Sequence, residues 1–151
     1  MTKPSSKLIN ILIGKAIIET VLVGSFAVWF NFSVFPPTFH GWGEAVSDTR
    51  SVAGWAVNNA SPWERVEVQL FIDDKFVANQ SAALSRTDVK DAGWANDEWH
   101  GYNFQVSASN PGKHVARVYA VHKSGSGARY TLQLLGDPIN FSITEAGALI
   151  R

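Results

Sequence analysis

Residues 66–89 read VEVQLFIDDKFVANQSAALSRTDV, and this segment predicts a β-hairpin that leads into a polar connection. Apolar side chains alternate with others in its first part, where one face carries Val66, Val68, Leu70 and Ile72. A period of two is typical of a strand with one buried face. Asp73 and Asp74 follow, and aspartate tolerates the positive φ angles of a tight hairpin turn. A short return strand is expected over residues 76–78, after which the alternation stops over residues 79–86.

Further alternating segments lie on both sides of this hairpin and are separated by turn residues. They are residues 50–58, 100–107, 114–122, 130–135 and 139–143. About seven short strands at such a spacing are typical of an antiparallel β-sandwich, so the expected fold class is all-β. Residues 85–99 are expected to form a long polar connection.

An apolar segment precedes the strands. Residues 16–35, AIIETVLVGSFAVWFNFSVF, match the roughly 20 residues that a helix needs to cross a bilayer. Aromatic residues from Trp29 to Phe35 gather at its far end like an interfacial belt, and Pro36-Pro37 prevents the helix from continuing. The lysines before it set the N-terminus inside: Lys3, Lys7 and Lys15. The expected organisation is a cytoplasmic segment 1–15, a transmembrane helix (signal anchor) 16–35, a linker 36–43, a sandwich 44–144 and a tail 145–151.

Two alternatives for the apolar segment stay open. Ser25-Phe26-Ala27 has the small residues of a signal-peptide cleavage site, although Glu19 interrupts the apolar region and the apolar run continues past the cut. Apolar residues around Ile13 also fit one face of a buried helix in a soluble protein. Residues 21–30 are apolar nearly all round, which favours lipid. We therefore expect a single-pass protein of the cytoplasmic (inner) membrane with an extracytoplasmic C-terminal domain.

Composition excludes several classes of site. The chain of 151 residues has a net charge of zero and no cysteine. It therefore has no electrostatic preference for nucleic acid, and it has no disulfide, thiolate metal site or nucleophilic cysteine. His114 and His122 stand about 26 Å apart on an extended strand at ~3.3 Å per residue, too far to share a metal. No hydrolase or zinc-protease motif is present, so no catalytic residue, metal or cofactor is expected.

One carboxylate-rich connection leaves calcium binding open. It holds Asp88, Asp91, Asp97 and Glu98. A solvated loop is favoured over a calcium site there, because charged residues in a connection are usually exposed to water.

Several short motifs occur in one order along the chain. They are Gly54-Trp55-Ala56, Val66-Glu67-Val68, Ile72-Asp73, Val77-Ala78, Arg86-Thr87-Asp88-Val89, Gly101-Tyr102-Asn103-Phe104, Gly112-Lys113-His114-Val115 and Val118-Tyr119-Ala120. Together, over residues 52–121, they resemble an immunoglobulin-like β-sandwich module appended to bacterial secreted and cell-surface proteins. The resemblance implies a fold and an extracytoplasmic setting. It implies no activity, because such modules are usually accessory and sandwiches host many functions.

The tryptophans and one charged pair supply the candidate residues. Trp55 is expected to fill the core from the middle of a strand. Arg86 and Asp88 are expected to tie the polar connection to the sheet. The candidate ligand- or partner-binding residues lie in loops: Trp63, Trp94, Asp97 and Trp99. Exposed loop aromatics either bind a ligand or cap the ends of the sandwich.

Two functional hypotheses follow. The first is a membrane-anchored interaction module, a non-catalytic accessory subunit or envelope scaffold with a protein partner in the membrane or envelope. Polar Glu19, Asn31 and Ser33 in or near the span favour such a partner, because polar groups in lipid seek partners. The alternative is a carbohydrate-binding module that uses the loop tryptophans. A subunit would expose an apolar patch, whereas a glycan binder would expose coplanar aromatic rings beside polar side chains.

Overall fold

The computed structural model describes residues 6–34, 38–106, 110–124 and 127–150, which fall into two units, 1–35 and 36–151. The first unit holds the helix α1 (Ser6–Val34). Its stretch Ile9–Phe30 has 22 residues and a mean hydropathy of 1.9, so it is long and apolar enough to be a signal anchor or a signal sequence. Lys15 pairs with Glu19 one turn away, at 3.5 Å.

The helix is longer than the predicted span. It begins at Ser6, and no proline interrupts residues 6–15. The segment expected to precede the span is therefore helical as well. Some predictions lie outside the described residues: they concern Phe35, Pro36, Pro37 and Ser107, and the side chains of Asn31, Phe32 and Ser33.

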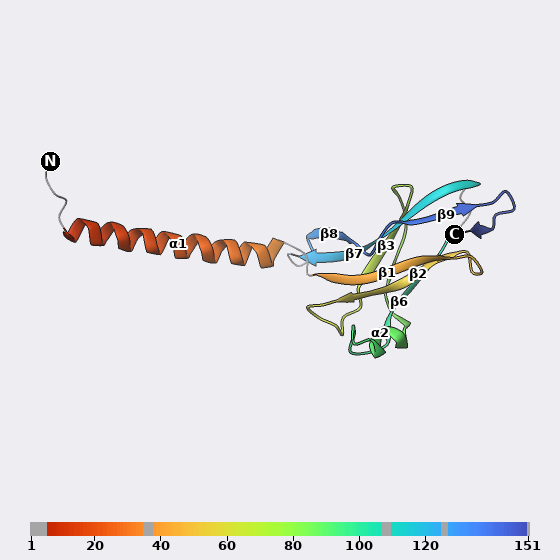
Figure 1. The fold of residues 1–151 in the computed structure, drawn as a ribbon, viewed down its shortest axis with the longest axis horizontal. Helices are drawn as coiled ribbons and strands as arrows, with labels where there is room; N and C mark the ends of the chain where they lie inside the picture. Colours follow the sequence, from red (N-terminus) through yellow and green to blue (C-terminus); the bar gives the residue numbers. More distant parts are fainter. Residues whose placement is uncertain (1–5, 35–37, 107–109, 125–126, 151) are drawn as a thin grey trace. The chain divides into compact units, whose positions relative to one another are not determined.

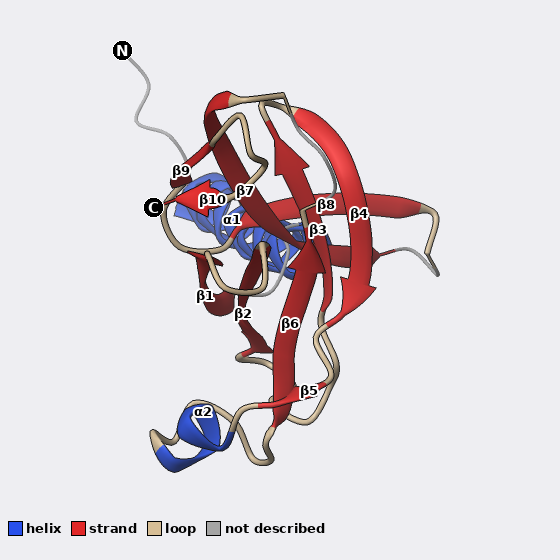
Figure 2. Cartoon of the chain, turned by 90° about the vertical axis from the view of Figure 1, so that its right-hand side faces the viewer, coloured by secondary structure: helices blue, strands red, loops and turns tan. Residues whose placement is uncertain are grey.

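The second unit consists of two antiparallel sheets (Figure 1). The four-stranded sheet has the order β1-β2-β6-β5, with β1 Phe39–Val46, β2 Ser51–Asn58, β6 Trp99–Gln105 and β5 Leu84–Ser85. The six-stranded sheet has the order β10-β9-β7-β3-β4, with β10 Leu149–Ile150, β9 Ile139–Ile143, β7 Gly112–Ser124, β3 Glu67–Ile72 and β4 Lys75–Ser81. Strand β8 (Arg129–Leu134) also pairs with β7. A short helix, α2 (Thr87–Asp91), lies beside β5 (Figure 2).

The hairpin is the predicted one. The inward residues of β3 are Val68, Leu70 and Ile72, at most 7% exposed. Asp73 and Asp74 form the turn with φ angles of 49° and 64°. The return strand β4 extends to Ser81, beyond the predicted end. A β-bulge leaves Val77 without a partner in β3, which shifts the alternation and hides the second half of the strand from sequence reasoning.

The first strand corrects the prediction of a linker over residues 36–43. Residues from Phe39 onward form β1 and pair with β2 along its whole length. The glycines suggested a linker, but they are needed because Tyr102 crosses this part of the core. Its hydroxyl donates a 3.2 Å hydrogen bond to the Trp42 carbonyl, and a Cβ atom at Gly43 or Gly54 would overlap that hydroxyl.

The gap between β1 and β8 is closed by a side chain. Gln133 accepts a 3.0 Å hydrogen bond from the backbone N–H of Phe39 and donates a 2.9 Å bond to the backbone oxygen of the same residue. Gln133 therefore takes the place of a paired strand at the first residue of β1. We call this the Gln133–Phe39 clasp.

Two further predictions need correction. The predicted tail 145–151 includes β10, whose Leu149 is 3% exposed and belongs to the main core. The predicted polar connection 85–99 includes part of β5 and all of α2. The described residues thus form ten strands instead of about seven. Short elements of two to five residues have too few positions to show a period.

Candidate functional site

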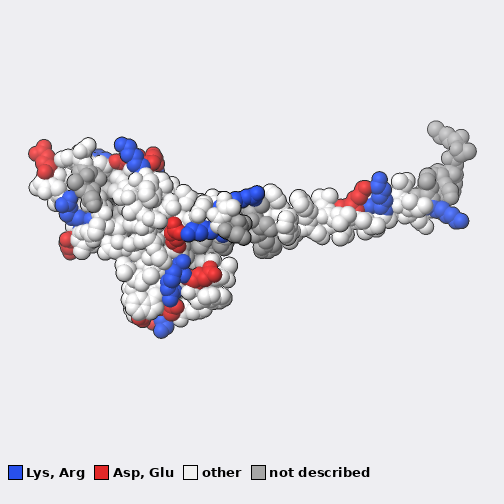
Figure 3. All heavy atoms as spheres, turned by 180° about the vertical axis from the view of Figure 1, so that it is seen from behind, with Lys and Arg blue, Asp and Glu red and all other residues white. Residues whose placement is uncertain are grey.

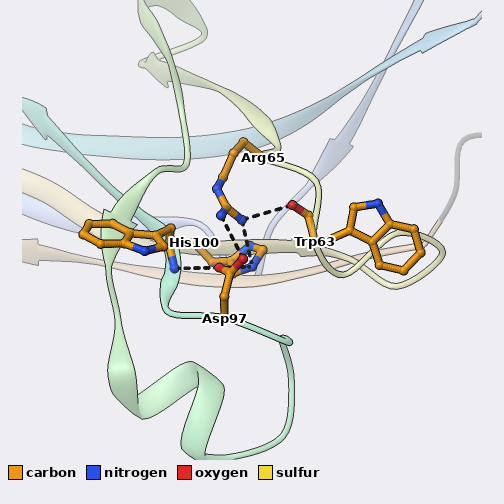
Figure 4. A network of polar contacts seen from close by, with 5 residues as sticks. Trp63, Arg65, Asp97 and His100 are labelled. Atoms are coloured by element: carbon orange, nitrogen blue, oxygen red, sulfur yellow. Dashed lines mark hydrogen bonds and ion pairs between the residues drawn. The ribbon is translucent and has the colours of Figure 1, made fainter.

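One arginine joins two loops at the end of the domain where β2 ends and β6 begins (Figure 4). Nη2 of Arg65 donates a 2.9 Å hydrogen bond to Oδ2 of Asp97. Nη1 lies 3.3 Å from Nε2 of His100 and donates a 3.2 Å bond to the backbone oxygen of Trp63. Asp97 also accepts a 2.9 Å bond from the backbone N–H of Trp99. We call these five residues the arginine cluster.

The charges in the arginine cluster follow from the burial of His100, which is 0% exposed. Burial lowers the pKa of His100, and the positive charge of Arg65 lowers it further. The imidazole is therefore neutral at pH 7. Its Nε2 lies 3.3 Å from both Nη1 of Arg65 and Oδ1 of Asp97, so it accepts from the arginine in one tautomer and donates to the carboxylate in the other. Hydrogen bonding from Arg65 lowers the pKa of Asp97, which is charged. The cluster thus holds one ion pair beside a neutral ring, an arrangement that fixes the two loops.

Three of the four predicted binding residues meet in this cluster: Trp63, Asp97 and Trp99. The two indoles are 61% and 47% exposed. Sequence reasoning missed Arg65, because its carboxylate partner lies 32 residues further along the chain and no local pattern links them.

The fourth predicted residue, Trp94, belongs to a different group. Its ring centroid lies 5.0 Å from that of His40 and 6.1 Å from that of Trp55, at interplanar angles of 37° and 34°. Trp42 lies opposite Trp55 in the β1–β2 register. We call these four residues the tryptophan platform. Trp94 and Trp42 are 48% and 42% exposed, so the platform is open to solvent.

The position of Trp55 corrects its predicted role. Trp55 is half-buried and is absent from the main core. It packs instead against a small cluster of Val57, Val89 and Ala95, on the face of β2 that points away from Tyr102. The segment around α2 covers this outward face, so both faces of β2 are largely buried.

The predicted pair of Arg86 and Asp88 is present at the start of α2. Nε and Nη2 of Arg86 donate to the two carboxylate oxygens of Asp88, at 2.8 and 2.7 Å. This bidentate contact lowers the pKa of Asp88. The stem of Arg86 lies over Gly101 of β6, where a Cβ atom would stand 2.8 Å from Cγ of Arg86. The effect of the pair on stability stays a prediction.

An apolar stripe crosses the outward face of the six-stranded sheet. We define it as Phe71, Phe76, Tyr119, Leu132 and Leu134. Phe71 contacts both Phe76 and Tyr119 edge-on, with centroids 5.7 and 5.4 Å apart, and Leu134 lies opposite Tyr119 in the β7–β8 register. Phe76 is 55% exposed and Leu132 44%.

The charged groups near the stripe are paired with one another. Glu67 pairs with Lys123, and Asp74 pairs with Arg117. In the view of Figure 3, Lys and Arg atoms of the β domain lie close to Asp and Glu atoms. The stripe is therefore bordered by neutralised pairs.

A histidine locks the tip of the β3–β4 hairpin to the start of β7. Nδ1 of His114 lies 2.6 Å from Oδ2 of Asp73, and Nε2 lies 2.7 Å from the backbone oxygen of Asn110. Both neighbours are acceptors, so the ring satisfies both when it carries two protons. The hydrogen bond to Asp73 raises the pKa of His114, and the same contact lowers the pKa of Asp73.

Acidic and histidine side chains do not gather into a metal site in the described part of the chain, where no group of three or more could hold an ion. Two of the carboxylates considered for calcium have other partners. Asp88 accepts hydrogen bonds from Arg86, and Asp97 accepts them from Arg65.

Comparison with known proteins assigns no family to the chain. No family model, no curated protein and no solved structure matches it. The inference of function therefore depends on the geometry described above.

Proposed function

We propose that the chain is a membrane-anchored, extracytoplasmic interaction module of immunoglobulin-like topology, which serves as a non-catalytic accessory subunit or envelope scaffold. In this proposal α1 is a signal anchor with its N-terminus inside, in agreement with the lysines at residues 3, 7 and 15. The partner is a protein of the membrane or envelope.

The strand orders support the immunoglobulin-like topology. Immunoglobulin sandwiches place strands A, B, E and D in one sheet, and strands C, F and G in the other, with C′ added beside C in variable domains. The order β1-β2-β6-β5 corresponds to A-B-E-D when the strands are lettered along the chain. The order β9-β7-β3-β4 corresponds to G-F-C-C′ when β8, which also pairs with β7, and β10 are left without letters.

The observation that carries the proposed interaction is the apolar stripe. Side chains from β3, β4, β7 and β8 form it, so it extends across the sheet and is larger than one exposed residue. Large apolar patches with a polar rim are typical of protein interfaces. Because Glu67–Lys123 and Asp74–Arg117 are paired internally, a partner need not neutralise these charges. Phe76 and Leu132, the most exposed members, are the expected anchors.

The test is capture of partners by the full-length chain from membranes in mild detergent. Phe76→Asp and Leu132→Asp introduce a charge at each end of the stripe, and each should reduce the recovery of a stoichiometric partner at least tenfold. Leu84→Asp is the matched control, because Leu84 is 50% exposed on the four-stranded sheet. Thermal unfolding confirms that each variant is folded.

Two results would contradict the proposal. One is recovery of the wild-type chain alone. The other is a partner that the two stripe variants retain as well as Leu84→Asp does.

Carbohydrate binding is the second candidate function. Half-exposed tryptophans beside polar side chains favour it, and the tryptophan platform supplies them. Trp63 and Trp99 project from the arginine cluster, where the side chains of Arg65 and Asp97 already bond to each other. The platform is therefore the better location for a glycan.

A further inference from the structure

We infer that the tryptophan platform on the outward face of the four-stranded sheet binds a pyranose ring of a neutral glycan whose ring hydroxyl groups are equatorial. This inference rests on the second proposed function and moves its site away from the loop that carries Trp63 and Trp99. It assigns new roles to His40 and Trp42, and it gives Trp55 a surface role in place of a core role.

The platform is built by strand register. Trp42 of β1 and Trp55 of β2 are directly opposed, and Trp55 is opposed in turn by Gly101 of β6. Opposed residues of an antiparallel pair share a face, with Cβ atoms about 5 Å apart. Trp94, from the loop after α2, packs against both Trp55 and His40. Three of the four rings thus contact one another, and Trp42 lies on the same face, opposite Trp55 in the register.

The aromatic surface suits the apolar face of a sugar. A pyranose ring with equatorial hydroxyl groups exposes C–H groups on both faces, and such a face can stack on an indole. The Trp55–Trp94 pair is tilted by 34° and the His40–Trp94 pair by 37°, so the three rings are not coplanar. A row of coplanar rings would suit a long flat chain, whereas this tilted arrangement suits one or two sugar units.

Polar groups lie next to the rings in the register. One position further along the outward face, Glu44, Ala53 and Asn103 are opposed across β1, β2 and β6. The Oδ1 atom of Asn103 is itself buried and has no hydrogen-bond partner among the described residues. The small side chain of Ala53 lies between the two polar residues in the register. Sugar sites combine an apolar surface with a few such polar groups, which fix the orientation of the ligand.

The side chain of Arg86, whose stem lies over Gly101, adds a further polar group beside the platform. It is held by Asp88 in a bidentate contact, so it is fixed before a ligand binds. The net charge of zero and the internal pairing of this arginine disfavour a polyanionic ligand. A neutral polyhydroxylated ligand remains the class that fits both the rings and the polar groups.

The experiment is calorimetric titration of the full-length chain with cellohexaose and with chitohexaose, in a detergent without a sugar headgroup. Quenching of tryptophan fluorescence provides a second readout. We expect one of the two hexasaccharides to bind. Trp42→Ala and Trp94→Ala should weaken binding at least tenfold, and Trp42→Phe should retain most of it because a ring remains. Trp63→Ala is the matched control, with an exposed tryptophan in the arginine cluster, and should change the affinity less than twofold.

The controls separate loss of binding from loss of fold. Trp94 packs against Trp55, so Trp94→Ala can also destabilise the domain, whereas Trp42→Ala removes a ring at the edge of the platform. A normal thermal unfolding curve is required of each variant. The inference is overturned if neither hexasaccharide binds at millimolar concentration. It is also overturned if Trp63→Ala loses as much affinity as Trp42→Ala.

The same variants separate this inference from the proposed protein interaction. If both proposals hold, Trp42→Ala loses the sugar and keeps the membrane partner, while Leu132→Asp loses the partner and keeps the sugar. If Trp42→Ala loses a protein partner and the wild-type chain binds no sugar, the platform is a protein interface and the inference is wrong.

Discussion

Replacement of Gln133 by leucine should destabilise the β domain, because it opens the Gln133–Phe39 clasp. Leucine is an apolar side chain of comparable size, so Gln133→Leu removes the two hydrogen bonds while it still fills most of the space of the glutamine. Phe39 is 6% exposed, and water has poor access to the backbone groups that the amide serves. The N–H and C=O of Phe39 would both lose their partner.

The magnitude follows from these two groups. A buried donor or acceptor that loses its partner costs about 1–3 kcal/mol, and partial access of water at the start of a strand favours the lower half of that range. We expect a loss of about 3 kcal/mol in the free energy of unfolding from both groups together. At roughly 4 °C per kcal/mol for a domain of this size, the melting temperature should fall by about 12 °C.

The assay is urea unfolding of the full-length chain in detergent, followed by near-ultraviolet circular dichroism of the tryptophans. Amide hydrogen exchange at Phe39 and His40 reports the clasp locally and should accelerate in Gln133→Leu. Thr131→Leu is the matched control, since Thr131 is exposed on the same strand, on the same side as Gln133. A loss below about 0.5 kcal/mol, within the range of ordinary surface substitutions, would refute the reasoning. Unchanged exchange at Phe39 would refute it as well.

Three further predictions concern other contacts. Arg86→Ala should lower the free energy of unfolding in urea by about 1 kcal/mol, because it removes an exposed ion pair and the packing of the arginine stem. Arg86→Lys should recover only part of this loss, since lysine cannot contact Asp88 in the same bidentate geometry. The raised pKa of His114 means that its contribution to stability is complete below the ordinary histidine pKa of about 6.5 and is lost as the pH rises through the folded-state pKa. Unfolding measured between pH 6 and pH 9 should therefore show a decline that is absent in His114→Gln, and an equal decline in both proteins would contradict the lock. Gly54→Ala should lower the free energy of unfolding by about 3 kcal/mol or more, because the new methyl group overlaps the carbonyl oxygen of Trp42. The melting temperature should then fall by roughly 12 °C, and a value within 2 °C of wild type would exclude this overlap.

Much of the β domain could be predicted from the sequence because its strands alternate cleanly. Strand β3 shows a buried face at every second residue, and the two aspartates of its turn have the positive φ angles that the hairpin requires. The apolar N-terminal helix was predictable for a similar reason, since a long run without a polar face leaves few alternatives.

The rest depends on contacts between distant residues. Strand β1 has glycines at residues 41 and 43, and the need for glycine at residue 43 comes from Tyr102, some 60 residues away. The direction of Trp55 could not be predicted from alternation, because α2 covers the outward face of β2 and buries both faces. Three predicted site residues meet through Arg65, whose partner lies in another loop. Trp94 likewise contacts His40, a residue that lies far from it in the sequence.

The two sheets face each other through one core, so the tryptophan platform and the apolar stripe look in opposite directions from the same rigid body. Packed sheets lie about 10 Å apart, which keeps a ligand on one face out of contact with a ligand on the other. If both proposals hold, a protein partner and a glycan can therefore be held at once without competition. When the two belong to one assembly, binding of one raises the effective concentration of the other at its own face.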